Sequence, residues 1–161
     1  MKTQPYRGSH LPALIHLFQI TTGPILELGS GMYSTCFLHW ACHPHSRPLY
    51  TYDGQAEWMP FAEQFRTDWH RVELVTDWPS LDLSGPWSIA LVDHDGPGVV
   101  RGQELRRLQH AEYVVCHDAE RHVQYGYTDV FPLFKYQYLM RNSRIRTMIL
   151  SNTHDLRGFT L

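Results

Sequence analysis

The sequence predicts an α/β fold, a doubly wound and mostly parallel sheet with helices on both faces. Three observations predict it. Short apolar runs alternate along the chain with segments of helical periodicity, which is typical of parallel strands joined by crossover helices. The first apolar run leads directly into a Gly-Ser-Gly turn. The last third contains two extended segments joined by a short turn, and such strands pair antiparallel.

Length and composition indicate one globular domain spanning residues 1–161. The chain has 161 residues, 43% of them hydrophobic, and a formal net charge of −2. This charge gives no general reason to bind nucleic acid or a membrane surface. There is no apolar run of about 20 residues and no signal-peptide pattern, so we expect a cytoplasmic protein. The three cysteines form no CxxC pair, which fits reduced thiols.

The first expected element is a helix with Ser9 as its N-cap. Leu11, Leu14, Ile15 and Phe18 follow helical spacing behind it. The helix should end before the Thr-Gly-Pro sequence at 22–24, and the first buried strand then covers 25–28.

The remaining elements follow the same alternation. The expected strands cover 48–52, 71–75, 87–92 and 111–116, and a hairpin of 134–140 and 145–150 closes the sheet. The intervening helices are expected over 35–42, over 55–69 and around 104–108. Arg101, Arg106 and Arg107 are interpreted as the solvent-facing side of the last helix.

The turn after the first strand predicts a ligand site. Gly29 and Gly31 remove side chains where the chain turns, and the following helix start favours an anionic group. A dinucleotide site has a third glycine, but Ser34 stands there, and Glu27 would repel a pyrophosphate. Glu27 instead suits an ammonium group. A ligand with both an amine and a carboxylate is an amino acid or a nucleoside joined to one.

The segment Glu27-Leu28-Gly29-Ser30-Gly31 has the form Glu/Asp-x-Gly-x-Gly. In this motif and in the terminal hairpin, the sequence resembles the class I S-adenosylmethionine-dependent methyltransferases over roughly residues 10–152. The resemblance implies a Rossmann-like sheet of five parallel strands plus a C-terminal antiparallel hairpin, in the order 3-2-1-4-5-7-6. It implies S-adenosylmethionine as the cofactor.

Several loop residues are then candidates for cofactor contacts. Asp53, at the carboxyl end of the second strand, is expected to accept hydrogen bonds from both ribose hydroxyls; an Asp-Gly turn is the alternative. Asp77 and Trp78 are candidates for the adenine ring, although a solvated loop carboxylate fits Asp77 equally well. The full cofactor set is Glu27, Gly29, Ser30, Gly31, Ser34, Asp53, Asp77, Trp78 and Asp93.

Polar residues also follow the fourth and fifth strands. Asp93 and Asp95 come after the fourth strand, and His117 and Asp118 after the fifth, so they should converge at one edge of the sheet. Asp95, His117 and Asp118 are the predicted catalytic residues, and Asp95 and Asp118 the predicted ligands of Mg²⁺. Metal-dependent relatives usually have a carboxylate or amide in place of His117. This departure favours the alternative that His117 or His94 is a general base.

The resulting functional prediction is methyl transfer to the hydroxyl of a small molecule, with Mg²⁺ assisting. The chain lacks the Asn/Asp-Pro-Pro-Tyr/Phe motif of many N-methyltransferases. It also lacks a long insertion over the acceptor site, so that site is open, completed by a second subunit of a homodimer, or suited to a large acceptor. The alternatives are a non-catalytic module that binds S-adenosylmethionine or a protein partner and, third, a nicotinamide-dependent oxidoreductase.

Overall fold

A computed structural model describes residues 5–95, 100–141 and 143–159. Within these residues seven strands form one sheet in the order β3-β2-β1-β4-β5-β7-β6. The strands are β1 Ile25–Leu28, β2 Leu49–Asp53, β3 His70–Leu74, β4 Ile89–Val92, β5 Tyr113–Cys116, β6 Tyr136–Met140 and β7 Thr147–Ser151. Strands β1 to β5 are parallel, and β7 pairs antiparallel with both β5 and β6. The predicted fold class and strand order are confirmed.

In the described part of the chain, four α-helices and several single-turn 3₁₀ helices accompany the strands. The α-helices are α1 Leu11–Ile20, α2 Ser34–Cys42, α3 Met59–Ala62 and α4 Val100–Arg107. The 3₁₀ helices are η1 Pro5–Gly8, η2 His43–His45, η3 Ala56–Trp58, η4 Glu63–Phe65, η5 Trp78–Ser80, η6 Ala119–Arg121 and η7 Phe131–Leu133. Among the described helices, none has the length and apolar content needed to cross a bilayer.

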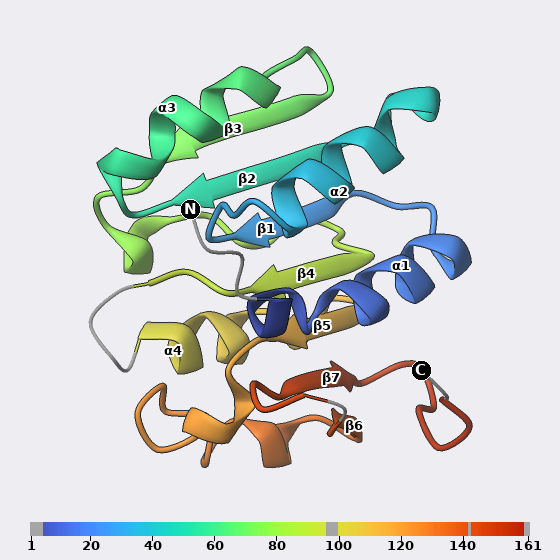
Figure 1. The fold of residues 1–161 in the computed structure, drawn as a ribbon. Helices are drawn as coiled ribbons and strands as arrows, with labels where there is room; N and C mark the ends of the chain where they lie inside the picture. The colour runs from blue at the N-terminus through green and yellow to red at the C-terminus, as the bar shows by residue number, and fades with distance from the viewer. Residues whose placement is uncertain (1–4, 96–99, 142, 160–161) are drawn as a thin grey trace.

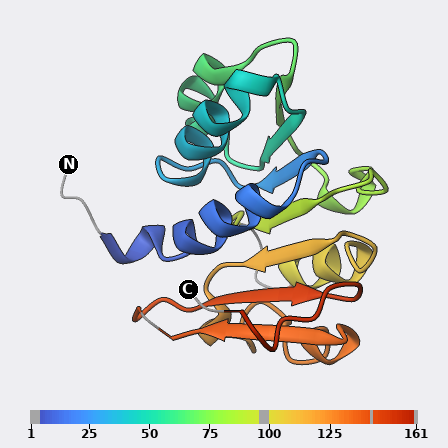
Figure 2. The same cartoon turned by 90° about the vertical axis from the view of Figure 1, so that its right-hand side faces the viewer.

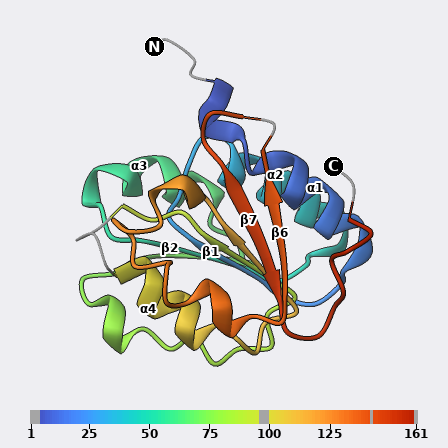
Figure 3. The same ribbon diagram turned by 90° about the horizontal axis from the view of Figure 1, so that it is seen from below.

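The sheet separates two apolar cores, and the view from below shows helices on both of its faces (Figure 3). Helices α1, α2 and α3 lie on one face, and α4 lies on the other. Because side chains alternate along a strand, Ile25 of β1 packs under α1 and α2, whereas Leu26 and Leu28 belong to the core with α4. Glu27 therefore points into the same face as Ile25.

All five parallel strands end at the same edge of the sheet, on the left in Figure 1. The hairpin β6–β7 lies at one lateral border and β3 at the other, and Figure 2 shows them well apart. β1 is central, because it pairs with β2 on one side and β4 on the other. The carboxyl edge of β2, β1, β4 and β5 is therefore where ligands of open α/β sheets bind.

Two predicted elements differ from the structure. The single helix expected over 55–69 is instead η3, α3 and η4, and the helical part ends at Phe65. Pro60 has no N–H to donate, which interrupts regular α-helical bonding there, and Arg66 is already extended. Ser9 is not a helix cap: His10 occupies the N-cap of α1 without a side-chain cap bond.

Candidate cofactor and acceptor site

The glycine loop after β1 has a strained position that only glycine can occupy. Gly29 has a φ of 97°, and a Cβ atom there would lie 2.5 Å from the backbone N and Cα of His94. The loop is thereby packed against the chain leaving β4. Gly31 differs, because a Cβ there would meet only the Ser34 hydroxyl at 3.6 Å. The loop is closed toward the protein at Gly29 and has space at Gly31.

Glu27 supports this loop from below. The Thr35 hydroxyl lies 3.0 Å from both Glu27 carboxylate oxygens and accepts a hydrogen bond from the Gly31 N–H at 2.9 Å. The Thr51 hydroxyl donates to Glu27 Oε2 at 2.6 Å. Glu27 is completely buried, so its carboxylate contacts these hydroxyls and is not exposed to a ligand lying above the loop. Burial outweighs these bonds and raises the pKa of Glu27 to about 7.

The hydrogen-bond chain continues to β3 and back to α2. His70 Nε2 lies 2.9 Å from the Thr51 hydroxyl, and His70 Nδ1 lies 3.0 Å from His39 Nδ1. If Thr51 donates to Glu27, His70 must donate to Thr51, and His39 must donate to His70. Burial lowers the pKa of His70 to about 4, which keeps the ring neutral for this arrangement.

Asp53 lies against the glycine loop, as its position at the end of β2 predicts. Its Oδ2 accepts hydrogen bonds from the backbone N–H of Ser30 at 2.7 Å and from the Ser30 hydroxyl at 2.5 Å, and Oδ1 accepts the Gln55 N–H at 2.8 Å. A carboxylate offers about four acceptor positions. Three of these positions are in use among the described residues, so one is left for a ligand hydroxyl. A second becomes available if the Ser30 hydroxyl turns away from Asp53.

Trp78 lies between the ends of β2 and β4. Its ring is buried and lies 4.0 Å from the His94 ring, centroid to centroid, and a Cβ atom on Gly54 would contact its indole nitrogen. Asp77 is exposed and accepts a hydrogen bond from the Ser80 hydroxyl. His94 is buried and pairs with Glu104 at 3.1 Å. His94 therefore faces the α4 core and is not placed as a base for an acceptor.

Arg101 binds the acidic cluster after β4 and β5. Its guanidinium lies 3.1 Å from Asp118 and 3.4 Å from both Asp93 and Asp95, and it stacks on the Tyr125 ring at 4.0 Å. Arg101 is 2% exposed, so its assignment to a solvent-facing surface was wrong. Asp118 adopts a left-handed conformation, with a φ of 53°, where it meets this guanidinium.

His117 is held at both ring nitrogens. Nδ1 lies 2.9 Å from Asp93 Oδ1, and Nε2 lies 3.1 Å from the Ser9 hydroxyl. Burial favours the neutral ring, but the Asp93 charge and hydrogen bond outweigh it, so the pKa of His117 is raised. Ser9 also lies 3.4 Å from the Thr147 hydroxyl, which connects the N-terminal segment to β7.

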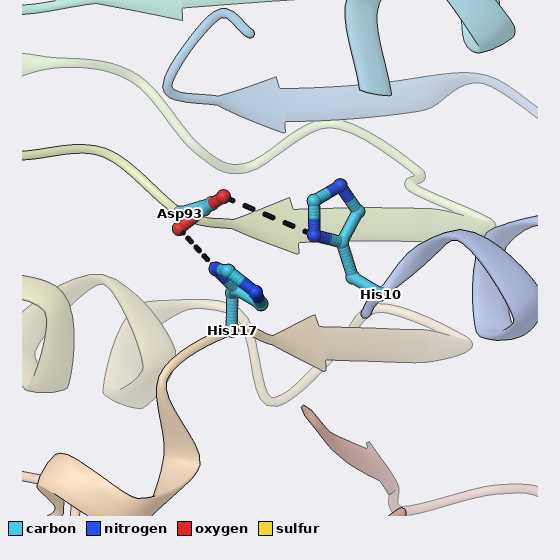
Figure 4. A group of neighbouring side chains, drawn as sticks. All are labelled: His10, Asp93 and His117. Carbon is cyan, nitrogen blue, oxygen red and sulfur yellow. Dashed lines mark hydrogen bonds and ion pairs between the residues drawn. The ribbon is translucent and has the colours of Figure 1, made fainter. Parts of the chain in front are cut away.

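His10 completes this cluster from the start of α1 (Figure 4). Its Nδ1 lies 4.0 Å from Asp93 Oδ2, and its ring meets the His117 ring edge-on at 4.7 Å. It is 2% exposed, and neither ring nitrogen has a hydrogen-bond partner among the described residues. Burial lowers the pKa of His10 to about 4.

The structure thus brings together most, not all, of the predicted site residues. Asp93, His117 and Asp118 converge, whereas the Asp95 side chain is 70% exposed and, among the described residues, touches the cluster only through Arg101. Glu27 and Ser34 are buried beneath the loop. Sequence reasoning missed Ser9, His10 and Arg101. Only Arg101 had a signal, because Arg101, Leu105 and Leu108 share one helix face at i, i+4 and i+7.

The sequence matches no protein-family model, and no curated protein matches it. Solved structures do match over nearly the whole chain. The N-methyltransferase NodS from Bradyrhizobium japonicum WM9 aligns with a TM-score of 0.66 at 12% identity, covering 96% of this chain and 100% of its own. The ribosomal protein L11 methylase from Lactobacillus delbrueckii subsp. bulgaricus gives 0.64 at 14%, covering 94% and 81%.

A third similar structure is the N-terminal domain of human METTL16 in complex with S-adenosylhomocysteine. It aligns with a TM-score of 0.57 at 10% identity and covers 96% of this chain and 73% of its own. At these identities the likeness establishes the fold and not the substrate. This chain has the fold of the class I S-adenosylmethionine-dependent methyltransferases.

Proposed function

We propose that this protein transfers a methyl group from S-adenosylmethionine to the hydroxyl of a small molecule. One observation carries the proposal: the Ser30–Asp53 contact joins the glycine loop to the end of β2, at the same sheet edge as the cluster after β4 and β5. A ligand lying along this edge would span both groups of residues.

The loop half of the edge fits the cofactor. Gly31 leaves room at the start of α2, where backbone N–H groups favour a carboxylate. Asp53 has an acceptor position for a ribose hydroxyl, and Trp78 offers a ring edge beside Gly54 for the adenine. Glu27 acts indirectly in this proposal. Its hydrogen bond with Thr35 positions the loop that receives the amino-acid end of the cofactor.

The β4–β5 half fits the acceptor. When bound, S-adenosylmethionine supplies an electrophilic methyl group for direct displacement, so the protein's task is alignment and exclusion of water. Asp93, His117 and Asp118 offer polar atoms around the incoming hydroxyl, and Asp95 lies at the exposed rim. We assign these residues to acceptor binding and to holding its proton.

The pair Asp95 and Asp118 does not fit a magnesium site. Mg²⁺ needs several oxygen ligands in near-octahedral geometry, but both carboxylates are bridged by the Arg101 guanidinium. Arg101 thus already occupies the space between these two carboxylates. Mg²⁺ assistance at these two residues therefore has no part in the proposal.

The choice of a small acceptor rests on charge. Among the similar structures, one METTL16 domain is complexed with an RNA hairpin, and another protein methylates a ribosomal protein. The net charge of −2 gives this chain no general attraction to RNA. We place its action in the cytoplasm, because all three cysteines, Cys36, Cys42 and Cys116, are free thiols.

Calorimetric titration with S-adenosylhomocysteine tests the cofactor half. We expect micromolar binding to the wild type, weakened at least tenfold by Asp53→Ala, with the exposed Asp68→Ala as matched control. A panel of phenols, sugars and other alcohols with radiolabelled cofactor then tests the acceptor half, and His117→Gln and Asp118→Asn should lower turnover while affinity for the cofactor product stays.

Other outcomes point to other functions. Binding of S-adenosylhomocysteine without turnover on any acceptor would support the non-catalytic binding module. Binding of NADH in its place would support the oxidoreductase. If the folded wild type binds none of these ligands, the loop is structural and the proposal is withdrawn.

A further inference from the structure

The cluster of His10, Asp93 and His117 gathers three metal-binding side chains from three separate elements. His10 lies at the start of α1, Asp93 just after β4 and His117 just after β5. One ligand atom from each lies within 4.8 Å of the others. With metal–ligand distances of about 2.0–2.2 Å, donor atoms of a tetrahedral site lie about 3.4 Å apart. Small side-chain movements would bring these three to that spacing.

His10 is the residue that points to a ligand. A buried imidazole normally finds hydrogen-bond partners, because an unpaired polar atom that has lost its water is destabilising. His10 is 2% exposed, and both of its nitrogens lack partners among the described residues. Nδ1 faces Asp93 Oδ2, an oxygen that His117 does not use. The ring is thus aimed at the centre of the cluster with a free lone pair.

His117 has the support that metal-binding histidines usually have. Such a ring commonly donates its second N–H to a neighbouring oxygen, which fixes the tautomer and the ring plane. The Ser9 hydroxyl lies 3.1 Å from His117 Nε2 and also near the Thr147 hydroxyl. In the metal-free protein Nδ1–H donates to Asp93 Oδ1. An ion bound there would replace that proton, while Nε2–H stays donated to Ser9.

The charge around the cluster also favours a divalent cation. Asp93, Asp95 and Asp118 contribute three carboxylates, against one guanidinium from Arg101. A dication at Asp93 would offset the remaining negative charge. Two imidazoles and one carboxylate select borderline transition metals over Mg²⁺ or Ca²⁺, which prefer oxygen ligands.

We propose that His10, Asp93 and His117 form a binding site for a divalent transition-metal ion of the zinc class. Three protein ligands leave a coordination position open to water or to an acceptor hydroxyl. The site lies where the proposed acceptor would bind, but metal binding itself does not depend on methyl transfer.

Titration of the metal-stripped protein with Zn²⁺, Co²⁺ and Mg²⁺ tests the site without cofactor or acceptor. We expect one Zn²⁺ per chain with micromolar or tighter affinity, an increase in Tm with Zn²⁺, and no measurable Mg²⁺ binding. Bound Co²⁺ should show the visible absorption of a low-symmetry, four- or five-coordinate site.

His10→Phe is the sharpest variant, because phenylalanine keeps the buried ring and its edge-on contact with His117 but has no ligand atom. It should fold, raise the Tm of the metal-free protein and weaken Zn²⁺ binding at least 100-fold. Asp93→Asn should weaken binding in the same direction, and Ser9→Ala by about tenfold. The matched control is His122→Ala, which removes an exposed histidine and should change nothing.

Two results would overturn the site: a folded wild type that does not bind Zn²⁺, or Zn²⁺ affinity that is unchanged in His10→Phe. Either result leaves the proposed methyl transfer untouched, because that function is tested by S-adenosylhomocysteine binding and turnover. Conversely, Zn²⁺ binding in a protein that binds no cofactor would retain the metal site alone.

Discussion

The two halves of the carboxyl edge differ in how completely the chain satisfies its own polar groups. In the loop half, the Glu27 carboxylate, the Thr35 hydroxyl and the Asp53 carboxylate all have protein partners between 2.5 and 3.0 Å. In the β4–β5 half, His10 is equally buried and has no partner on either nitrogen among the described residues.

The difference indicates that the loop half is fully formed by the fold itself, whereas the β4–β5 half is completed by a bound ligand. A fully paired network has one geometry and can receive a cofactor with little rearrangement. An unpaired buried imidazole lowers the unfolding free energy of the metal-free protein, and this loss is reversed when an ion binds. Mutations in the paired network of the loop half should therefore lower stability, whereas mutation of His10 should act mainly on ligand binding.

The largest effect should come from the most constrained point of the loop half. Gly29→Ala places a Cβ atom 2.5 Å from the His94 backbone at a positive φ, so we expect a loss of about 4 kcal/mol in unfolding free energy. Gly31→Ala is the matched control, with a loss below about 1 kcal/mol and weaker cofactor binding. Urea denaturation measures both, and equal losses would show that the loop is not packed as described.

Arg101 should have the next largest effect, and it belongs to the other half. Arg101→Leu leaves Asp118 buried without its guanidinium and should cost about 3 kcal/mol in unfolding free energy. Asp118→Asn in the same chain should restore part of that loss. Arg106→Leu, at an exposed position of α4, is the control. If Arg101→Leu behaves like Arg106→Leu, the acidic cluster does not need an internal cation.

Glu27 should make the unfolding free energy depend on pH. Its pKa is raised from 4.5 to about 7, so the folded protein keeps a proton that the unfolded chain releases in this range. That stabilising contribution is present below pH 4.5 and is lost as pH rises to 7, which amounts to about 3 kcal/mol. Glu27→Gln cannot titrate, so its stability relative to wild type should increase by that amount from pH 4.5 to 7.5.

The exposed Glu57→Gln provides the comparison for this pH series, measured by chemical denaturation at each pH. A stability difference between Glu27→Gln and wild type that stays constant with pH would mean that Glu27 is ionised in the folded protein throughout.

The smallest effect should come from the contact between loop and β2. Ser30→Ala removes one hydrogen bond to Asp53 and should cost about 1 kcal/mol in unfolding free energy. It also frees a carboxylate position, so affinity for S-adenosylhomocysteine should stay or improve. A large loss of affinity would instead assign the Ser30 hydroxyl to the cofactor directly.

The sequence was sufficient for the parts of this molecule that depend on local pattern. Apolar composition predicts strands such as Ile25–Leu28. The glycine turn and the position of Asp53 then follow from where the first two strands end. The short helices around Pro60 were harder, since apolar spacing predicts a helical face but not where bonding is interrupted.

The β4–β5 cluster depends on contacts that no local pattern encodes. Ser9 looked like a helix cap because a serine before a helical segment usually is one, yet its hydroxyl is bonded to His117. His10 stands 83 positions from Asp93 in the sequence, and only the completed sheet makes them neighbours. Arginine in a helix is usually solvated, so the buried side of Arg101 was overlooked despite its spacing.

The contact between Ser9 and His117 also sets an order of events during synthesis. The two residues are 108 positions apart, so at about 5–20 residues per second the ribosome makes His117 roughly 5–20 s after Ser9. Until then the start of α1 has no partner at this edge, while β1 and β2 already exist and can pair. The loop half can thus form on a nascent chain before the residues that complete the acceptor half have been made.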